Sequence, residues 1–256
     1  LYAMYPNMTG VLSALLARNG VPGLKETFEG KAGFFNMYYA GVFDESAFDG
    51  LGDRFEGEGV SIKPWPCCRF TNSHVDAALQ IAQKEHVDPR SISRITLYYA
   101  EDETKRCLDP LDLRRNPQTI PEAKLSLPFT VAQALAYRKV EIGDFDKSSL
   151  SDPVLKRLCS ITFPEYDESL KSSLSKTMLP GRVLVETDDG VVYDKRVDVV
   201  YGHPRNRMKW NDLAGKFRDC ASFGKKRMSV GEVDEVIDMV GDLERVEDVS
   251  RIMDAI

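Results

Sequence analysis

Residues 62–74, IKPWPCCRFTNSH, mark the point at which this chain changes from purely helical to mixed sequence patterns. Proline fixes φ at about −65° and biases the residue before it toward extended backbone. Lys63 and Trp65 each precede a proline, so we expect an extended, stiff loop here. A stiff loop that also carries an arginine, a threonine and a histidine suits an anionic small molecule.

Downstream of this loop, helical patterns alternate with other signals. Helical spacing or a capping signal predicts helices over residues 74–85, 125–137 and 153–158, the last capped by Asp152. Residues 101–121 are polar and contain three prolines, which predicts a long loop.

The strand signals lie in the same part of the chain. Residues 92–99 alternate between apolar and polar side chains, as in a half-buried strand. Residues 182–187 and 191–199 are rich in β-branched side chains and flank Asp188-Asp189-Gly190. Because Asp-Gly favours a turn with positive φ, these two segments are expected to form a hairpin.

Both ends of the chain show helical patterns only. Apolar residues recur at helical spacing over residues 11–16, 230–240 and 246–256, and Ser229 with Glu232 forms a capping-box pattern. The predicted fold class is therefore α+β. Residues 1–50 and 208–256 are expected to belong to an all-helical domain, into which a smaller α+β lid domain, residues 51–207, is inserted. The apolar helix so near Leu1 also leads us to expect further sequence upstream.

Composition excludes several classes of partner. The net charge is −6 with a pI of about 5.3, whereas nucleic-acid binding needs a concentrated basic surface. No apolar run approaches the ~20 residues needed to cross a membrane, and the first residues do not read as a signal peptide. Five irregularly spaced cysteines favour reduced thiols. We expect neither nucleic-acid nor membrane binding, and a cytoplasmic location (mitochondrial in a eukaryote).

Three side chains of the opening loop are candidates for chemistry. Lys63 could hold a substrate carboxylate or act as a base, although an exposed lysine at a strand edge is the simpler interpretation. Arg69 could clamp a carboxylate with two hydrogen bonds. His74 begins a helix, where its pKa should fall and leave a neutral imidazole; local capping or packing is the alternative.

Metal and cofactor binding find little support. Cys67 and Cys68 are adjacent, so they do not have the Cys-x-x-Cys spacing of zinc sites. No Gly-rich phosphate loop or nucleophile elbow is present in the sequence. We therefore expect no metal and no cofactor.

Several segments, in order, resemble the MmgE/PrpD family, which includes 2-methylcitrate dehydratases, cis-aconitate decarboxylases and related epimerases. The matching segments are GVLSALLA (10–17) with GVPG (20–23), FEGKAGF (28–34), IKPWPCCRF (62–70), AKLSLPF (123–129), DPV (152–154), DG (189–190) and LAGKF (213–217). The resemblance covers nearly the whole chain.

This resemblance implies a helical domain with an α+β lid and an interdomain cleft for small di- or tricarboxylates. It also implies cofactor-independent lyase chemistry, such as dehydration of 2-methylcitrate or citrate in propionate metabolism, usually in a homodimer. Lys63 matches the family's catalytic lid lysine. The expected substrate-binding residues are Arg69, Thr71, His74 and Tyr2. Tyr2 stands where many members of the family have histidine.

The sequence also departs from the family pattern. The other catalytic residues of the family fall upstream of Leu1, and Phe129 replaces a tyrosine. We therefore expect this chain to contain only half of the catalytic site and to be inactive on its own. The alternatives are a decarboxylase or epimerase of the same family, an inert truncated member that serves as an interaction protein, or a metal- or thiol-dependent enzyme that uses Cys67, Cys68 and His74.

Overall fold

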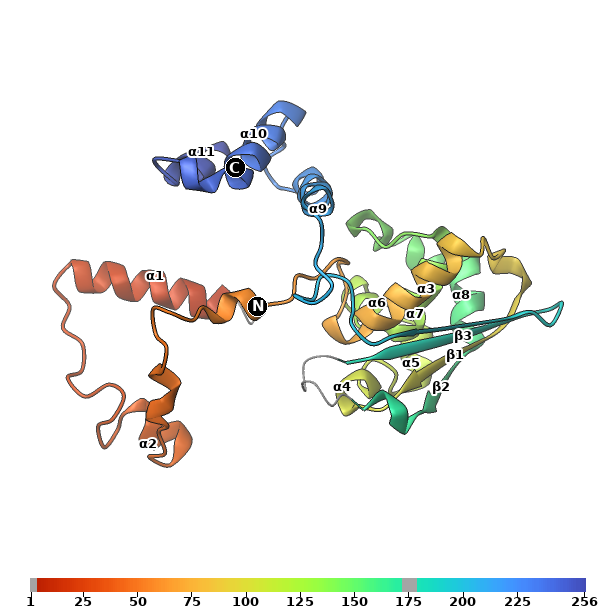
Figure 1. Cartoon of the computed structure of the whole chain (residues 1–256), viewed down its shortest axis with the longest axis horizontal. Coiled ribbons are helices and arrows are strands. Elements are labelled where there is room, and N and C mark those ends of the chain that lie inside the picture. Colours follow the sequence, from red (N-terminus) through yellow and green to blue (C-terminus); the bar gives the residue numbers. More distant parts are fainter. Residues whose placement is uncertain (1–3, 172–178) are drawn as a thin grey trace. The chain divides into compact units, whose positions relative to one another are not determined.

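The computed structural model describes residues 4–171 and 179–256. The chain divides into two compact units, residues 1–56 and 57–256, which are described separately (Figure 1). Within the described ranges, no helix has the length and apolar character required to cross a membrane.

The first unit is helical and has little core of its own. It contains α1 (Met4–Arg18), α2 (Phe34–Tyr39) and a 3₁₀ helix (Glu45–Phe48). The helix predicted from the spacing of residues 11–16 is confirmed; α1 stops at Arg18, and Gly20 has φ +82°. Among the described residues of this unit only Gly30 and Gly33 are buried, so the apolar side chains of α1 stay exposed.

The second unit is built on a four-stranded mixed sheet. Its strands are β1 (Ile92–Tyr99), β2 (Thr162–Tyr166), β3 (Gly181–Thr187) and β4 (Val192–Val197), in the order β2-β1-β3-β4. β1 is parallel to β2 and antiparallel to β3, which is antiparallel to β4. The predicted hairpin is confirmed, and Gly190 at its turn has φ +83°.

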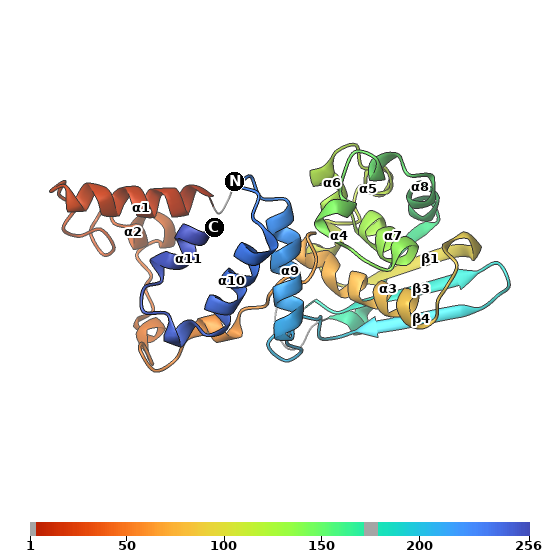
Figure 2. The same ribbon diagram turned by 90° about the horizontal axis from the view of Figure 1, so that it is seen from above.

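Helices cover one face of this sheet (Figure 2). α3 (Asn72–Lys84) packs on β3 and β4, and α7 (Leu127–Tyr137) packs between α3 and α8 (Pro153–Ser160). The side chains between these layers form one apolar core, which includes Val75, Ile95, Leu97, Val131 and Val183. The sequence-based prediction of an α+β chain is thus confirmed.

One expectation for this unit was wrong, and one strand was not predicted. Residues 101–121 are not a continuous loop, because they contain α4 (Asp102–Lys105), α5 (Leu111–Arg115) and the start of α6 (Ile120–Lys124). α6 begins with a capping box formed by Thr119 and Glu122. The strand β2 was not predicted, because it is short and contains Pro164, which suits only an edge position.

The last three helices are α9 (Trp210–Ser222), α10 (Val230–Gly241) and α11 (Ser250–Ala255). The capping box at Ser229 and Glu232 is confirmed. A second small core joins α9 and α10 through Ala214, Val233 and Ile237. The proposed return of these helices into an all-helical domain, and the boundaries 1–50, 51–207 and 208–256, remain predictions.

Candidate functional site

The loop that carries Lys63 is fixed by backbone contacts to three separate segments. Ile62 N–H donates a hydrogen bond to Gly202 O (2.9 Å), and Cys68 N–H donates to Lys124 O (2.8 Å). Lys216 Nζ, on α9, donates to Lys63 O (2.5 Å). The loop therefore has a defined path even though it forms no strand.

The Lys63 side chain is exposed, and its ammonium makes no hydrogen bond or ion pair with any residue in the described ranges. A fixed backbone and a free ammonium together suit a lysine that binds a ligand. The hydrogen bonds that hold the backbone limit the conformational entropy lost on binding, and no carboxylate of the chain competes for the ammonium. The position fits an exposed anion-binding group.

Arg69, six residues after Lys63 in the same loop, lies in a cationic neighbourhood. Its Nη2 is 3.4 Å from Ser61 Oγ, and partial burial lowers the pKa of its guanidinium. Burial lowers the pKa of His203 as well, with further contributions from the charges of Arg69 and Arg205. Because the backbone of Ile62 is hydrogen-bonded to that of Gly202, the fold brings His203 and Arg205 close to the Lys63–Arg69 loop. The sequence patterns gave no indication that His203 and Arg205 lie near this loop.

Thr71 and His74 have structural roles in this conformation. Thr71 is fully buried, and its hydroxyl donates to Cys68 O (2.8 Å). His74 is also fully buried, with Nε2 2.8 Å from Tyr98 O. Burial lowers the pKa of His74 to about 4, against a smaller opposing effect of that hydrogen bond, so the imidazole is neutral. Neither side chain reaches a surface that a ligand could touch.

Close packing explains the position of His74. Nδ1 has no hydrogen-bond partner among the described residues, and a Cβ built on Gly181 would lie 2.7 Å from it. The ring therefore fills the space between α3 and the start of β3. The remaining predicted residue, Tyr2, lies outside the described residues.

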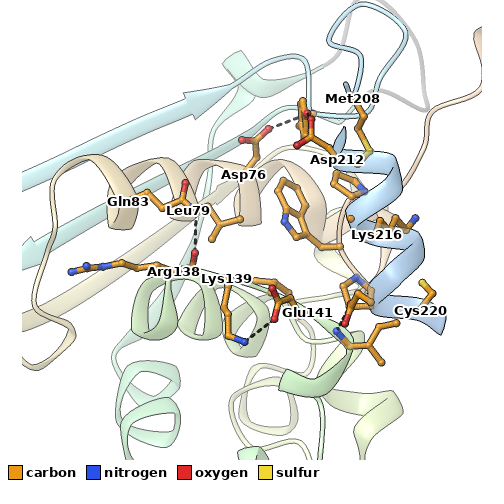
Figure 3. A pocket seen from close by; sticks show the side chains of 18 of the residues that line it. Asp76, Leu79, Gln83, Arg138, Lys139, Glu141, Met208, Asp212, Lys216 and Cys220 are labelled. Carbon is orange, nitrogen blue, oxygen red and sulfur yellow. Dashed lines mark hydrogen bonds and ion pairs between the residues drawn. The ribbon is translucent and has the colours of Figure 1, made fainter. Parts of the chain in front are cut away.

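A cavity of about 600 Å³ lies between α3, the segment after α7, and α9 (Figure 3). Trp65 from the Lys63 loop forms part of its wall, but none of the four predicted site residues that the structure describes lines it. The charged lining side chains are Asp76, Glu141, Asp212, Asp219, Arg138, Lys139 and Lys216.

Most of these charges already have partners. Tyr201 donates to Asp212 (2.5 Å), Lys139 pairs with Glu141 (2.7 Å), and Ile142 N–H donates to Asp219 (3.2 Å). The lining carries four carboxylates against three cationic side chains, which does not favour the entry of a tricarboxylate. Lys63 does not line the cavity, and its ammonium has no ion-pair partner among the described residues. We therefore place the candidate anion site at the Lys63 loop rather than in this cavity.

The described residues contain no group of three or more His, Cys, Asp or Glu side chains arranged to hold a metal ion. Cys67 is buried, with its sulfur 3.2 Å from Thr71 Oγ1 and 3.1 Å from Asn72 Nδ2, and burial raises its pKa to about 11. This thiol is a packed structural residue.

The fold and the site together define an α+β domain with a cationic loop at its surface. The sequence profile of the MmgE/PrpD C-terminal domain matches residues 65–242. This match covers more than half of the chain, which therefore belongs to the MmgE/PrpD family.

Individual relatives point in the same direction. The chain is 26% identical to human cis-aconitate decarboxylase over 251 residues, which covers 94% of this chain and 49% of the relative. It is 25% identical to the mouse protein over 247 residues, covering 94% of this chain and 48% of that protein. A cis-aconitate decarboxylase-like protein of Aspergillus oryzae is 24% identical over 241 residues, which is 86% of this chain and 49% of that protein. The chain spans about half the length of the curated relatives it matches.

Proposed function

We propose that this chain supplies the lid side of a lyase site for a small di- or tricarboxylate, with Lys63 as the group that contacts the substrate. The observation that carries the proposal is the anchored Lys63 backbone with its free ammonium, on a loop that also carries Arg69. Membership of the MmgE/PrpD family supports it.

Among the reactions of the family, we favour decarboxylation of a substrate resembling cis-aconitate. The three relatives all carry that activity in their names, whereas the family resemblance of the sequence implies dehydration of 2-methylcitrate or citrate. Dehydration stays as the second candidate. In both reactions negative charge develops next to a carboxylate, and a nearby ammonium stabilises that charge and holds the substrate in place.

The site in this chain alone is proposed to be incomplete. Phe129, where many members have tyrosine, is buried beside Phe145 with ring centroids 6.2 Å apart, so it offers no proton donor. α1 presents Val11, Leu12, Leu15 and Leu16 to solvent, each at least 44% exposed. Such a large apolar surface suits contact with further protein, either additional helices of a longer chain or a second subunit of a homodimer.

Equilibrium dialysis with labelled cis-aconitate tests this proposal. Binding by the wild-type chain should weaken about tenfold in Lys63→Met, because one charge-assisted contact is lost. The matched control is Lys156→Met on the exposed face of α8, which should bind like wild type. Equal binding by all three proteins would contradict the proposed role of Lys63. If wild type does not bind cis-aconitate at all, the proposed carboxylate site is contradicted and an inert interaction protein is favoured.

A turnover assay tests the second half of the proposal. The chain alone is expected to release neither carbon dioxide from cis-aconitate nor water from citrate or 2-methylcitrate. Clear turnover of any of the three would show that the chain holds a complete site and contradict the proposed incompleteness.

A further inference from the structure

Two neighbouring cysteines of the Lys63 loop have different surroundings. The Cys67 sulfur is enclosed by Thr71 and Asn72. The Cys68 side chain is only half-buried, and its thiol is hydrogen-bonded to the thiol of Cys107. Adjacent residues in an irregular loop thus give one packed thiol and one accessible thiol.

The fold holds Cys68 and Cys107 together through the segment that leads into α7. Cys68 N–H donates to Lys124 O (2.8 Å), and Leu127 N–H donates to Cys107 O (2.9 Å). Lys124 and Leu127 are three residues apart at the α6–α7 junction, so both cysteine backbones are tied to the same short segment. Cys107 itself is 3% exposed. The pair therefore combines an accessible sulfur with a sheltered one.

The surroundings favour the thiolate form of Cys68. Its pKa is lowered to about 6, first by the hydrogen bond with the Cys107 thiol and further by the Phe70 N–H and the charges of Lys63 and Arg114, against the opposing effect of burial. The same hydrogen bond raises the pKa of Cys107, so the two sulfurs share one proton. The thiolate is the form that attacks electrophiles.

We propose that Cys68 and Cys107 are a redox modification site, which a hydroperoxide converts reversibly into a disulfide. The Cys68 thiolate attacks the peroxide oxygen, the O–O bond breaks, and Cys68 becomes a sulfenic acid as the alkoxide or hydroxide leaves and takes up a proton. The Cys107 thiol then attacks the Cys68 sulfur, the S–S bond forms, and water leaves. Two thiols lose two electrons and two protons, and one hydroperoxide is reduced to an alcohol (or water) and water.

This inference stands apart from the proposed lyase function, since it needs only the thiol pair. If formed, the disulfide would add a covalent tie between the Lys63 loop and the segment after α4. The remaining cysteines differ from the pair. Cys159 is buried, which raises its pKa to about 12, and Cys220 lies exposed on α9.

Peptide mapping of the peroxide-treated chain tests the proposal without any variant. After oxidation, blocking of free thiols and denaturation, trypsin should release residues 55–69 linked to residues 107–114, with fragmentation assigning the link to Cys68. This species should exceed every other cysteine link by about tenfold and disappear on treatment with dithiothreitol. Absence of the linked pair, or a link through Cys67, overturns the proposal.

Single replacements separate the roles of the two sulfurs. In Cys107→Ser, peroxide should leave a Cys68 sulfenic acid that a cyclic 1,3-diketone traps, because no resolving thiol is present. In Cys68→Ser, the same reagent should label Cys107 at least about tenfold less, because that sulfur is sheltered. The matched control Cys220→Ser should form the disulfide as wild type does. Equal trapping at Cys68 and Cys107, or disulfide loss in Cys220→Ser, contradicts the assignment.

Discussion

Ile62 and Gly202 lie in direct backbone contact, and this contact sets the path of the chain into Lys63. Ile62 N–H donates to Gly202 O at 2.9 Å, and a Cβ built on Gly202 would lie 2.1 Å from Ile62 O. Gly202 also has φ +87°, in the region that favours glycine. The lysine at the centre of the proposed site is thus positioned by a residue that cannot carry a side chain.

The first prediction concerns this glycine. Gly202→Ala should lower the free energy of unfolding by about 3 kcal/mol, because backbone strain adds to the clash with Ile62. The matched control is Gly190→Ala, where φ is +83° but nothing lies within 4 Å. That replacement should cost only about 1 kcal/mol. Urea unfolding of both variants measures the difference, and equal losses would show that the close approach to Ile62 does not matter.

The second prediction concerns His74 and pH. Burial lowers the pKa of this imidazole to about 4 in the folded chain, below its ordinary value of about 6.5 in an unfolded one. The unfolded state therefore binds more protons between these values, and stability is lost as the pH falls from about 6.5 toward 4. The loss from this group alone amounts to about 3 kcal/mol.

Urea unfolding at several pH values checks the contribution of His74. The difference in unfolding free energy between wild type and His74→Gln should shrink as the pH falls from 7 toward 4. The control is His86→Asn at an exposed position with φ +51°, which asparagine tolerates. If the unfolding free energies of wild type and His74→Gln run parallel over this pH range, the imidazole of His74 is not buried and neutral as described.

The third prediction concerns the reactivity of Cys68. Its rate of alkylation by iodoacetamide should rise with a midpoint near pH 6, because its pKa is lowered to about 6. In Cys107→Ala, which removes the hydrogen-bond donor, the midpoint should move up toward the ordinary value of about 8.5. Residue-specific mass spectrometry over pH 5–9 measures both profiles. An unchanged midpoint in Cys107→Ala would show that the Cys107 thiol does not lower the pKa of Cys68.

The parts of the fold that follow local rules could be predicted from the sequence. Asp189-Gly190 predicted the hairpin, and Ser229 with Glu232 predicted the start of α10. The alternation of apolar and polar side chains predicted β1. The same rules, applied to Thr119 and Glu122, would also have located α6. β2 was missed because its pairing with β1 joins segments far apart in the sequence, and its proline argued against a strand.

The candidate site was predictable only in part. The sequence singled out Lys63, because two prolines and the family resemblance pointed to its loop, and its role in the site stays a prediction. His74 lies four residues before Ala78 and seven before Ile81, so helical spacing places it on the buried face of α3. That spacing could have indicated a core residue. The neighbourhood of His203 and Arg205 could not be foreseen, since it depends on the contact between Ile62 and Gly202.

The central claim is that a small carboxylate binds at the Lys63 loop rather than in the cavity beside α9. The most direct test is an NMR titration of the chain with ¹³C-dimethylated lysines and cis-aconitate, with lysine-to-arginine variants for assignment. The account predicts that the Lys63 signal moves with saturation, while those of Lys139 and Lys216 in the cavity move little. Movement of the cavity lysines with a stationary Lys63 signal would contradict it.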